Sequence, residues 1–543
     1  MGDSPTAARP PVRRPRLVLA VFLAACGART ELQESQSEPS CPPSKDLTGT
    51  ACLDLPVPGS DAGSFHPEAG AGPTVPADAA PSRDASSPPL TDGAATDGAA
   101  IDAPAEATSL ACTYGPSLAP VPDASTVGPW ATGSDHHITG LARDRQGNVF
   151  AAGTMTNQAF YLAKFDATGT LIWSKSIGGD LDAEANGLAV DAEGSVVVAA
   201  TTRKADGVSL DFGAGPVSAG GLVLKYDRNG AIQFQRFFPM ADNGNSFPFM
   251  NGVVVLSSGD IVVGGSLQGT VDFGGGPLTA KGGISAFLAR FGPCGAFESA
   301  RQFGSSIPDH WSWTYGLAVN GTDQIVMTGI FEGGIDFGAG ELDAPANSTD
   351  YDAFIARFDA SGAPIASRDL RTADPNGTPG VPAIDDDGNA VMVGRSSQPI
   401  DLGGGDLAAG GTLDAYVAKY GPKLEYVWGH RFTGADQVGA TAATIDSEAN
   451  IVFTGWLSGD ATFGGFALHL SGASEALFVA KLGTDGSVVS AQAARGLDSV
   501  GLALTAADGT NVLLGGAVYS GDFALGPFAL SSPLGGVVMR FAP

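Results

Sequence analysis

Apolar residues recur along the chain in a sevenfold pattern of short runs separated by turn-forming residues. One phrase, of the form apolar-apolar-Ala-Lys-aromatic, recurs with 59 to 67 residues between consecutive ends. A second phrase, of the form Gly-Leu-Ala-Val-Asp-x-x-Gly-Asn, precedes each copy of the first. Self-similarity at a nearly fixed period is typical of repeat architectures. The first phrase ends at Phe165, Tyr226, Phe291, Phe358, Tyr420, Leu482 and Phe541.

Each copy predicts four antiparallel strands. Two alternating or β-branched runs flank a turn such as Glu193-Gly194, which is typical of a hairpin. The phrase that ends in an aromatic residue predicts a third strand, and a turn such as 166–169 leads to a fourth. Four such strands repeated seven times favour an all-β, seven-bladed β-propeller over a linear solenoid, whose repeats are shorter and need polar caps.

The ends of the repeated region predict a closed ring. The seventh copy stops after its third strand, whereas an unassigned stretch, TVGPWATG at 126–133, precedes the first copy. This stretch is similar to the fourth strand of the first copy, TLIWSKSIGG. We therefore expect an N-terminal strand to complete the last blade, because an unpaired blade edge invites aggregation.

The repeat resembles the bacterial β-propeller repeat family called SBBP, which is common in secreted and surface proteins. The resemblance covers about residues 126–543 and rests on the pattern D-x-F-V-A-K-F-D-x-x-G together with the Gly-x-Ala-Val-Asp phrase. The sixth copy departs most, at Leu482 and at 449–450, and the first copy lacks the VDFG stretch of the others. The resemblance implies a propeller fold and an extracytoplasmic setting, but no activity.

The N-terminus predicts export and lipid attachment. Arginines precede a nine-residue apolar run, much shorter than the roughly 20 residues that span a bilayer as a helix. The following LAAC at 23–26 resembles the lipobox of bacterial lipoproteins, which implies that residues 1–25 are a signal peptide and that Cys26 is acylated. A plain signal peptide is the alternative. By the same resemblance, Gly27 implies sorting to the outer membrane or cell surface of a Gram-negative-type bacterium.

Residues 26–111 are expected to form a disordered tether, and residues 112–543 the propeller. Ser, Pro, Ala, Asp and Thr dominate the tether, and so few apolar side chains cannot offset the entropy of ordering it. Four further cysteines permit two disulfides in three possible pairings. In one pairing Cys41 joins Cys52, and Cys112 joins Cys294, which would pin the tether to the propeller.

Charged residues recur in the repeats. A basic residue occupies one position of every copy, and five copies place an acid before Phe or Leu. Basic residues that faced the channel would form a ligand ring; the alternative, which their repetition favours, is that each stem packs on its blade and its head meets water or a carboxylate. The basic residues are Lys164, Lys225, Arg290, Arg357, Lys419, Lys481 and Arg540. The acids are Asp211, Asp272, Asp336, Asp401 and Asp522.

Ligand-binding residues are expected where the chain breaks the repeat, in the connections between blades. Exposed aromatic side chains there suit a sugar or a peptide; the alternative is that they plug the channel or cover the blades. Histidines next to Asp135 and Asp309 make zinc a minor alternative. The candidate ligand contacts are Trp311, Trp313, Tyr315, His310, Phe247, Phe249, His136 and His137.

Several classes of function are disfavoured. The net charge of −28 excludes nucleic acid as a partner, because a polyanion would be repelled. The stretch AIDDDGNAVMVG begins like a calcium loop but lacks its final Glu, so it predicts a hairpin turn. We expect no catalytic residue, metal or cofactor. The expected function is a monomeric, membrane-anchored module that binds a protein or glycan; the alternatives are a polysaccharide lyase or glycosidase, and an envelope-assembly scaffold.

Overall fold

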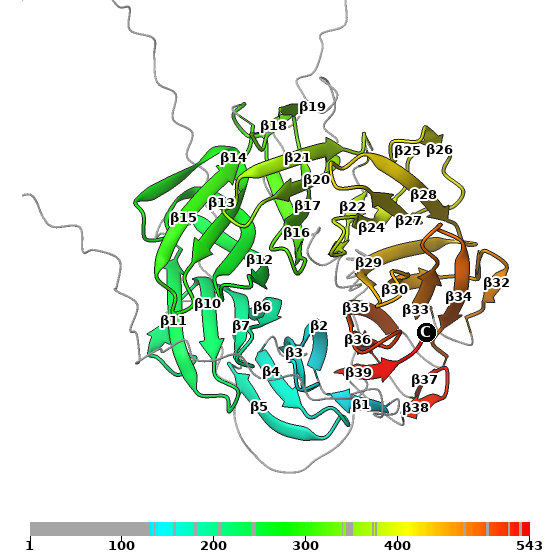
Figure 1. Ribbon diagram of the computed structural model, residues 1–543, viewed down its shortest axis with the longest axis horizontal. Coiled ribbons are helices and arrows are strands. Elements are labelled where there is room, and N and C mark those ends of the chain that lie inside the picture. Colours follow the sequence, from blue (N-terminus) through cyan, green and yellow to red (C-terminus); the bar gives the residue numbers. More distant parts are fainter. Residues whose placement is uncertain are drawn as a thin grey trace, which may run out of the picture. The chain divides into compact units, whose positions relative to one another are not determined.

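The computed structural model describes residues 130–543 except 135, 156–158, 179–181, 204–208, 241–245, 306, 339, 344–350, 372–373, 375–376, 471–473, 496–498, 520–521 and 531–534. All of them belong to the second of the chain's two units, residues 102–543. The described residues form strands and turns, and none of them forms a helix that could cross a membrane. Seven antiparallel sheets are arranged as blades around a central opening (Figure 1). This confirms the predicted seven-bladed propeller.

The first three blades each contain four main strands. Blade 1 contains β2 (His136–Arg143), β3 (Val149–Met155), β4 (Phe160–Phe165) and β5 (Leu171–Ile177). Blade 2 contains β6 (Asp182–Val190), β7 (Val196–Arg203), β10 (Gly220–Tyr226) and β11 (Ile232–Pro239). Blade 3 contains β12 (Phe247–Val255), β13 (Ile261–Asp272), β14 (Pro277–Phe291) and β15 (Phe297–Phe303).

The remaining blades follow the same order, except that the first strand of blade 5 is split in two. Blade 4 contains β16 (Ser312–Val319), β17 (Ile325–Phe331), β20 (Asp352–Phe358) and β21 (Pro364–Asp369). Blade 5 contains β22 (Thr378–Pro379), β23 (Ala383–Ile384), β24 (Ala390–Ser396), β27 (Asp414–Tyr420) and β28 (Tyr426–Phe432). Blade 6 contains β29 (Gln437–Ile445), β30 (Ile451–Ser458), β33 (Ala476–Leu482) and β34 (Val488–Ala493). Blade 7 contains β35 (Ser499–Ala506), β36 (Val512–Val518), β39 (Gly535–Phe541) and β1 (Trp130–Ser134).

The predicted N-terminal strand closes the ring. Strand β1 pairs antiparallel with β39, from Trp130 opposite Arg540 to Ser134 opposite Gly536, and so becomes the outer strand of blade 7. Residues 126–129 of the predicted strand lie outside the described residues. The Trp130 side chain packs on Gly169 of blade 1, where any Cβ would lie 2.6 Å from the indole ring.

The contact that Trp130 makes across the seam recurs at other blade junctions. In each case a tryptophan on an outer strand donates its indole N–H to a turn carbonyl of the next blade, and its ring packs on a glycine of that turn. The seam between blades 7 and 1 is therefore built like an internal junction. The donor and acceptor pairs are Trp130 with Ala167 (2.9 Å), Trp173 with Arg228 (3.1 Å) and Trp428 with Thr484 (3.1 Å).

The third strand of each blade is an almost continuous apolar run because neighbouring blades cover both of its faces. All seven residues of β10, β20, β27, β33 and β39 are buried, whereas the outer strand β5 alternates between exposed and half-buried residues. The outer strand thus shows the alternation expected of a half-buried strand, whereas the third strand does not.

The VDFG stretches form small hairpins between the second and third strands, except in blade 3, where they prolong β13 and β14. In four of them the Asp carboxylate accepts hydrogen bonds from backbone N–H groups two or four residues later, so these acids shape a turn. The hairpins are β8 (Leu210–Asp211) with β9 (Pro216–Val217), β18 (Gly334–Asp336) with β19 (Glu341–Asp343), β25 (Ile400–Asp401) with β26 (Asp406–Leu407), β31 (Ala461–Phe463) with β32 (Phe466–Leu468), and β37 (Phe523–Leu525) with β38 (Phe528–Leu530).

The recurring basic residues are structural, as their repetition predicts. In five blades the basic residue pairs with a carboxylate of the hairpin turn in its own blade, and several also donate to a carbonyl of the next blade. These side chains therefore serve the packing of the blades, and those of blades 1, 2 and 3 also join each of these blades to the next. The pairs are Lys164 with Asp144, Lys225 with Asp191, Arg290 with Asp260, Lys481 with Asp446 and Arg540 with Asp508.

Candidate functional site

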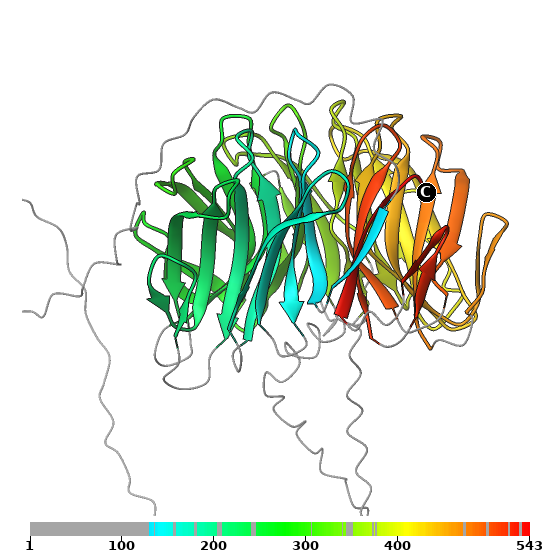
Figure 2. The same ribbon diagram turned by 90° about the horizontal axis from the view of Figure 1, so that it is seen from below.

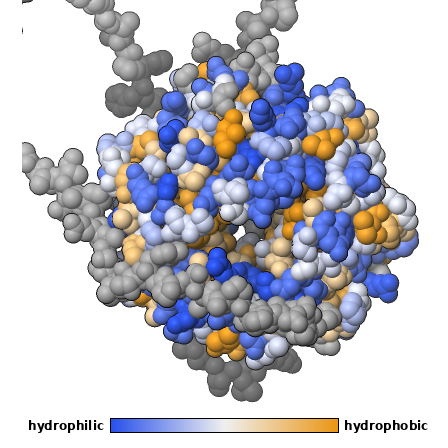
Figure 3. Space-filling view, viewed as in Figure 1, coloured by the Kyte–Doolittle hydropathy of each residue, from blue (hydrophilic) through white to orange (hydrophobic). Residues whose placement is uncertain are grey.

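One face of the ring carries both the connections between blades and the small hairpins; we call it the connection face. It includes the described parts of 304–311, 332–343 and 397–413. The tight turns inside the blades lie on the opposite face, at the upper edge of Figure 2, because antiparallel strands alternate in direction. Figure 3 looks at the face with the tight turns, where hydrophilic residues are intermixed with scattered apolar ones around a narrow central opening.

Three of the predicted aromatic contacts come together where blades 3 and 4 meet. The ring of Phe249 lies 4.3 Å from that of Phe247 and 4.7 Å from that of Trp313, measured between centroids. Phe247 and Trp313 are only 6% and 5% exposed. They therefore have little surface to offer a ligand, and the alternative in which they pack in the blades is the better interpretation for these two residues.

Trp311 is half-buried at the start of blade 4. Its ring lies 5.0 Å from the ring of the buried Tyr351, between centroids. Its side chain is hydrogen-bonded to the Glu332 carboxyl, and burial raises the pKa of Glu332 to about 7. A flat indole beside a carboxyl group that can hold or release a proton near neutral pH suits a hydroxyl-bearing ligand.

Sequence reasoning did not single out Glu332. The register of the second strands shows why it is unusual: the position after Phe331 holds Glu in blade 4, whereas blades 3 and 6 hold the neutral Gln268 and Ser458 there. The sequence signal for Glu332 is therefore an acidic residue at a position where the aligned blades have neutral ones. Its raised pKa is caused by burial, which the repeat pattern does not reveal.

His310 lies beside the same group. Its Nδ1 would be 2.3 Å from any Cβ at residue 333, so the glycine there leaves room for the imidazole. Within the described part of the chain this buried Nδ1 has no hydrogen-bond partner. Tyr315 lies on β16, and its buried hydroxyl likewise has no hydrogen-bond partner among the described residues. Burial raises the pKa of Tyr315.

The other two predicted histidines lie in blade 1, on β2. His136 is buried and stacks on Tyr161, with ring centroids 3.6 Å apart. His137 meets the Tyr519 ring edge-on at 5.2 Å, and burial lowers the pKa of His137. The structure does not bring this pair together with His310, and in the described part of the chain no three His, Cys, Asp or Glu side chains form a metal site.

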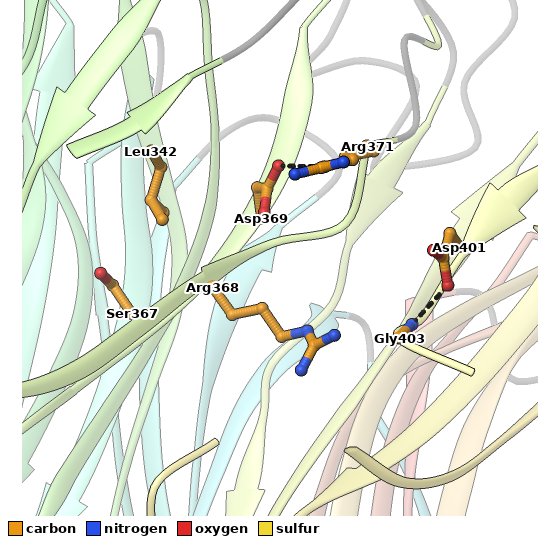
Figure 4. Close-up of a pocket in the computed structure, with 7 residues that line it drawn as sticks. All are labelled: Leu342, Ser367, Arg368, Asp369, Arg371, Asp401 and Gly403. Atoms are coloured by element: carbon orange, nitrogen blue, oxygen red, sulfur yellow. Dashed lines mark hydrogen bonds and ion pairs between the residues drawn. The ribbon is translucent and has the colours of Figure 1, made fainter. Parts of the chain in front are cut away.

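A pocket that sequence reasoning missed lies between the small hairpins of blades 4 and 5, as Figure 4 shows. Its volume is about 340 Å³. It is lined by Ser367, Arg368 and Asp369 of β21, by Arg371, by Leu342 of β19, and by Asp401 and Gly403 of the β25–β26 hairpin. These residues come from different blades, so no local pattern announces the pocket.

Cys294, in the turn between β14 and β15, is disulfide-bonded. The other four cysteines, Cys26, Cys41, Cys52 and Cys112, lie outside the described residues, as do the predicted signal peptide and tether. A disulfide at Cys294 is in keeping with an oxidising environment.

No protein-family model matches the chain. A stretch of 90 residues is 31% identical to the uncharacterized WD repeat-containing protein L264 of Acanthamoeba polyphaga mimivirus; it covers 15% of the chain and 6% of that protein. Among solved structures, the chain is similar to a protein of unknown function from Bacteroides caccae, with 10% identity, a TM-score of 0.34, and coverage of 64% of this chain and 93% of the other. It is also similar to YCF48 bound to a D1 peptide, with 10% identity, a TM-score of 0.36, and coverage of 76% and 95%. Similarities this weak assign no family, and the resemblance to SBBP repeats stays a prediction.

Proposed function

We propose that the protein is an exported lipoprotein of the SBBP type whose propeller binds a glycan or another macromolecule at the connection face, without catalysing a reaction. The observation that carries the binding proposal is the group formed by Trp311, Glu332 and His310. It combines a half-buried indole, a carboxyl group with its pKa near neutrality and an imidazole nitrogen without a described partner. All three break the repeat, whereas the repeated charged residues are used within the fold.

Binding is tested by a screen of the purified protein on polysaccharides and cell-envelope extracts, in which retention and product formation are both measured. On a ligand that the screen recovers, Trp311→Ala is expected to weaken binding at least tenfold, about 1.4 kcal/mol, because stacking on the indole is lost. The melting temperature should change little, since Trp311 is half-buried. The matched control is Trp313→Phe, which should lower the melting temperature and leave affinity nearly unchanged.

Two outcomes of this screen count against the proposal. If the Trp311→Ala protein binds with unchanged affinity, the group formed by Trp311, Glu332 and His310 is not the binding site. Release of reducing ends or unsaturated sugars would instead show that the protein is a glycosidase or a lyase. In such an enzyme the Glu332 carboxyl group, with its raised pKa, would be the proton donor.

Anchoring has a separate test. Cys26→Ser is expected to move the protein from the membrane fraction to the soluble extracytoplasmic fraction, because the thiol that would carry the lipid is gone. The Cys294 disulfide supports export. A Cys41→Ser protein is the control and should stay in the membrane fraction. Retention of the Cys26→Ser protein with membranes contradicts the lipoprotein proposal.

A further inference from the structure

The pocket between blades 4 and 5 combines residues of the repeat, such as Asp401 and Gly403 of the VDFG turn, with Asp369, which departs from it. Asp369 lies opposite Phe354 in the β20–β21 pair, and the corresponding positions of blades 1, 3 and 6 hold the uncharged Ser176, Gln302 and Ala493. The positions that need charge for the fold are the recurring ion pairs, and Asp369 is not one of them. Blade 5 holds Arg431 at this position, where it pairs with the buried Asp414 of its own blade. The negative charge of Asp369 therefore has no counterpart at the aligned positions of these blades.

Arg371 has an unusual backbone conformation for a long side chain. Its φ is 41°, in the left-handed region that side chains disfavour. Its Nε lies 3.2 Å from Asp369 Oδ2, and its side chain is 76% exposed at the pocket rim (Figure 4). Within the described part of the chain its terminal N–H groups have no partner. Strain held at a pocket rim is an observation from which a functional hypothesis can start.

The floor of the pocket is rigid. The Arg368 guanidinium lies over the Tyr420 ring, 5.6 Å from its centroid, and donates to the Leu424 carbonyl. It also approaches Gly403 so closely that a Cβ there would lie 2.2 Å from a guanidinium nitrogen. Gly403 has a φ of 110°, so the hairpin of blade 5 provides both the turn and the space for this arginine. The donors are thus positioned before a ligand arrives.

The chemistry of the pocket selects a neutral, hydroxyl-rich ligand. Two guanidinium groups and two carboxylates line it, so its charges cancel. An anionic ligand would be repelled by a chain whose net charge is −28. A hydroxyl group can accept from a guanidinium and donate to a carboxylate, and Leu342 offers an apolar contact for C–H groups. The volume of about 340 Å³ is at the lower end of the range for small-molecule sites.

We infer that this pocket is a subsite for a neutral sugar unit, held by Arg371 and Asp369 at the rim and by Arg368 and Asp401 inside. The inference rests on the proposed function, because it names the class of glycan that the connection face takes. It also goes beyond that proposal: the sugar-binding group lies between blades 4 and 5, apart from Trp311.

The test uses the full-length protein and calorimetric titration with cellotetraose, maltotetraose and mannotetraose as neutral probes and tetragalacturonate as the anionic one. At least one neutral probe is expected to bind, and Arg371→Gly should weaken it at least tenfold. Glycine accepts the left-handed backbone, so the melting temperature should stay the same or rise. The control is Arg228→Ala, an exposed arginine on the opposite face that carries the same charge change and should leave affinity unchanged.

The outcomes separate this inference from the proposed function. If Trp311→Ala weakens a neutral probe but neither Arg371→Gly nor Asp369→Asn does, the connection face binds glycans and the pocket inference is wrong. Tighter binding of tetragalacturonate than of every neutral probe overturns the neutral ligand class. The absence of binding by all neutral probes also overturns it.

Discussion

A protein that begins at residue 135 is expected to melt about 5 °C or more below one that begins at residue 115, and to aggregate on heating. The truncation removes β1 and with it the five paired positions of the β1–β39 ladder. Strand β39, all of whose residues are buried, would become the edge of blade 7. A bared apolar edge offers unpaired N–H and C=O groups to a second chain, which is why aggregation should accompany the lower melting temperature. Thermal unfolding with light scattering measures both effects.

The role of the seam is isolated by two point variants of the full chain. Trp130→Ala removes the contact with the Ala167 carbonyl and the packing on Gly169, and Trp173→Ala removes the equivalent contact inside the ring. Since both indoles are half-buried, each change should cost about 2–3 kcal/mol. Equal melting temperatures for the two truncated proteins would show that β1 does not close the ring.

Lys225→Met is expected to lower the free energy of unfolding by about 3–5 kcal/mol, because it leaves a buried charge without its partner. Lys225 Nζ lies 2.8 Å from Asp191 Oδ2, and the two side chains are 1% and 0% exposed. The ammonium group also donates to the Pro293 carbonyl in blade 3, at 2.9 Å. The change therefore weakens both blade 2 and its junction with blade 3. Denaturant unfolding measures the loss.

Two further variants test whether the unpaired carboxylate of Asp191 causes the loss of stability in the Lys225→Met protein. Asp191 Oδ1 accepts the backbone N–H groups of Glu193 and Ser195, and an asparagine oxygen can keep these bonds. Lys225→Met combined with Asp191→Asn should therefore recover at least about 1 kcal/mol of the loss. The control Lys281→Met changes an exposed lysine and should have almost no effect. A Lys225→Met protein as stable as this control would contradict the argument.

The fold could be predicted because each blade is encoded locally. Turns such as 144–148 and 166–169 are specified by Asp and Gly at fixed positions, whose carboxylates and positive φ angles close the hairpin. The similarity of the stretch around Trp130 to the one around Trp173 reflects a shared contact, so it also predicted the pairing of β1. Hydrogen bonds between successive strands depend little on the rest of the ring.

The candidate site could be predicted only in part. Its general location followed from the rule that ligand contacts break the repeat, and Trp311 and His310 lie together beside Glu332. Trp313, only two residues further on, belongs to a strand that the neighbouring blade covers, so its side chain is buried. A sequence in which both tryptophans stand in the same irregular stretch does not report this difference.

By itself, then, the sequence of this protein determined the seven blades, their four-stranded plan and the strand that closes them, since these depend on spacing and on turns a few residues long. Only the tertiary structure decided which side chains are open to a ligand. Arg371 and Asp401 are 30 positions apart in the sequence and line one pocket because blades 4 and 5 pack side by side. The burial that raises the pKa of Glu332 and the shape of that pocket arise from tertiary contacts, which the repeat pattern in the sequence does not report.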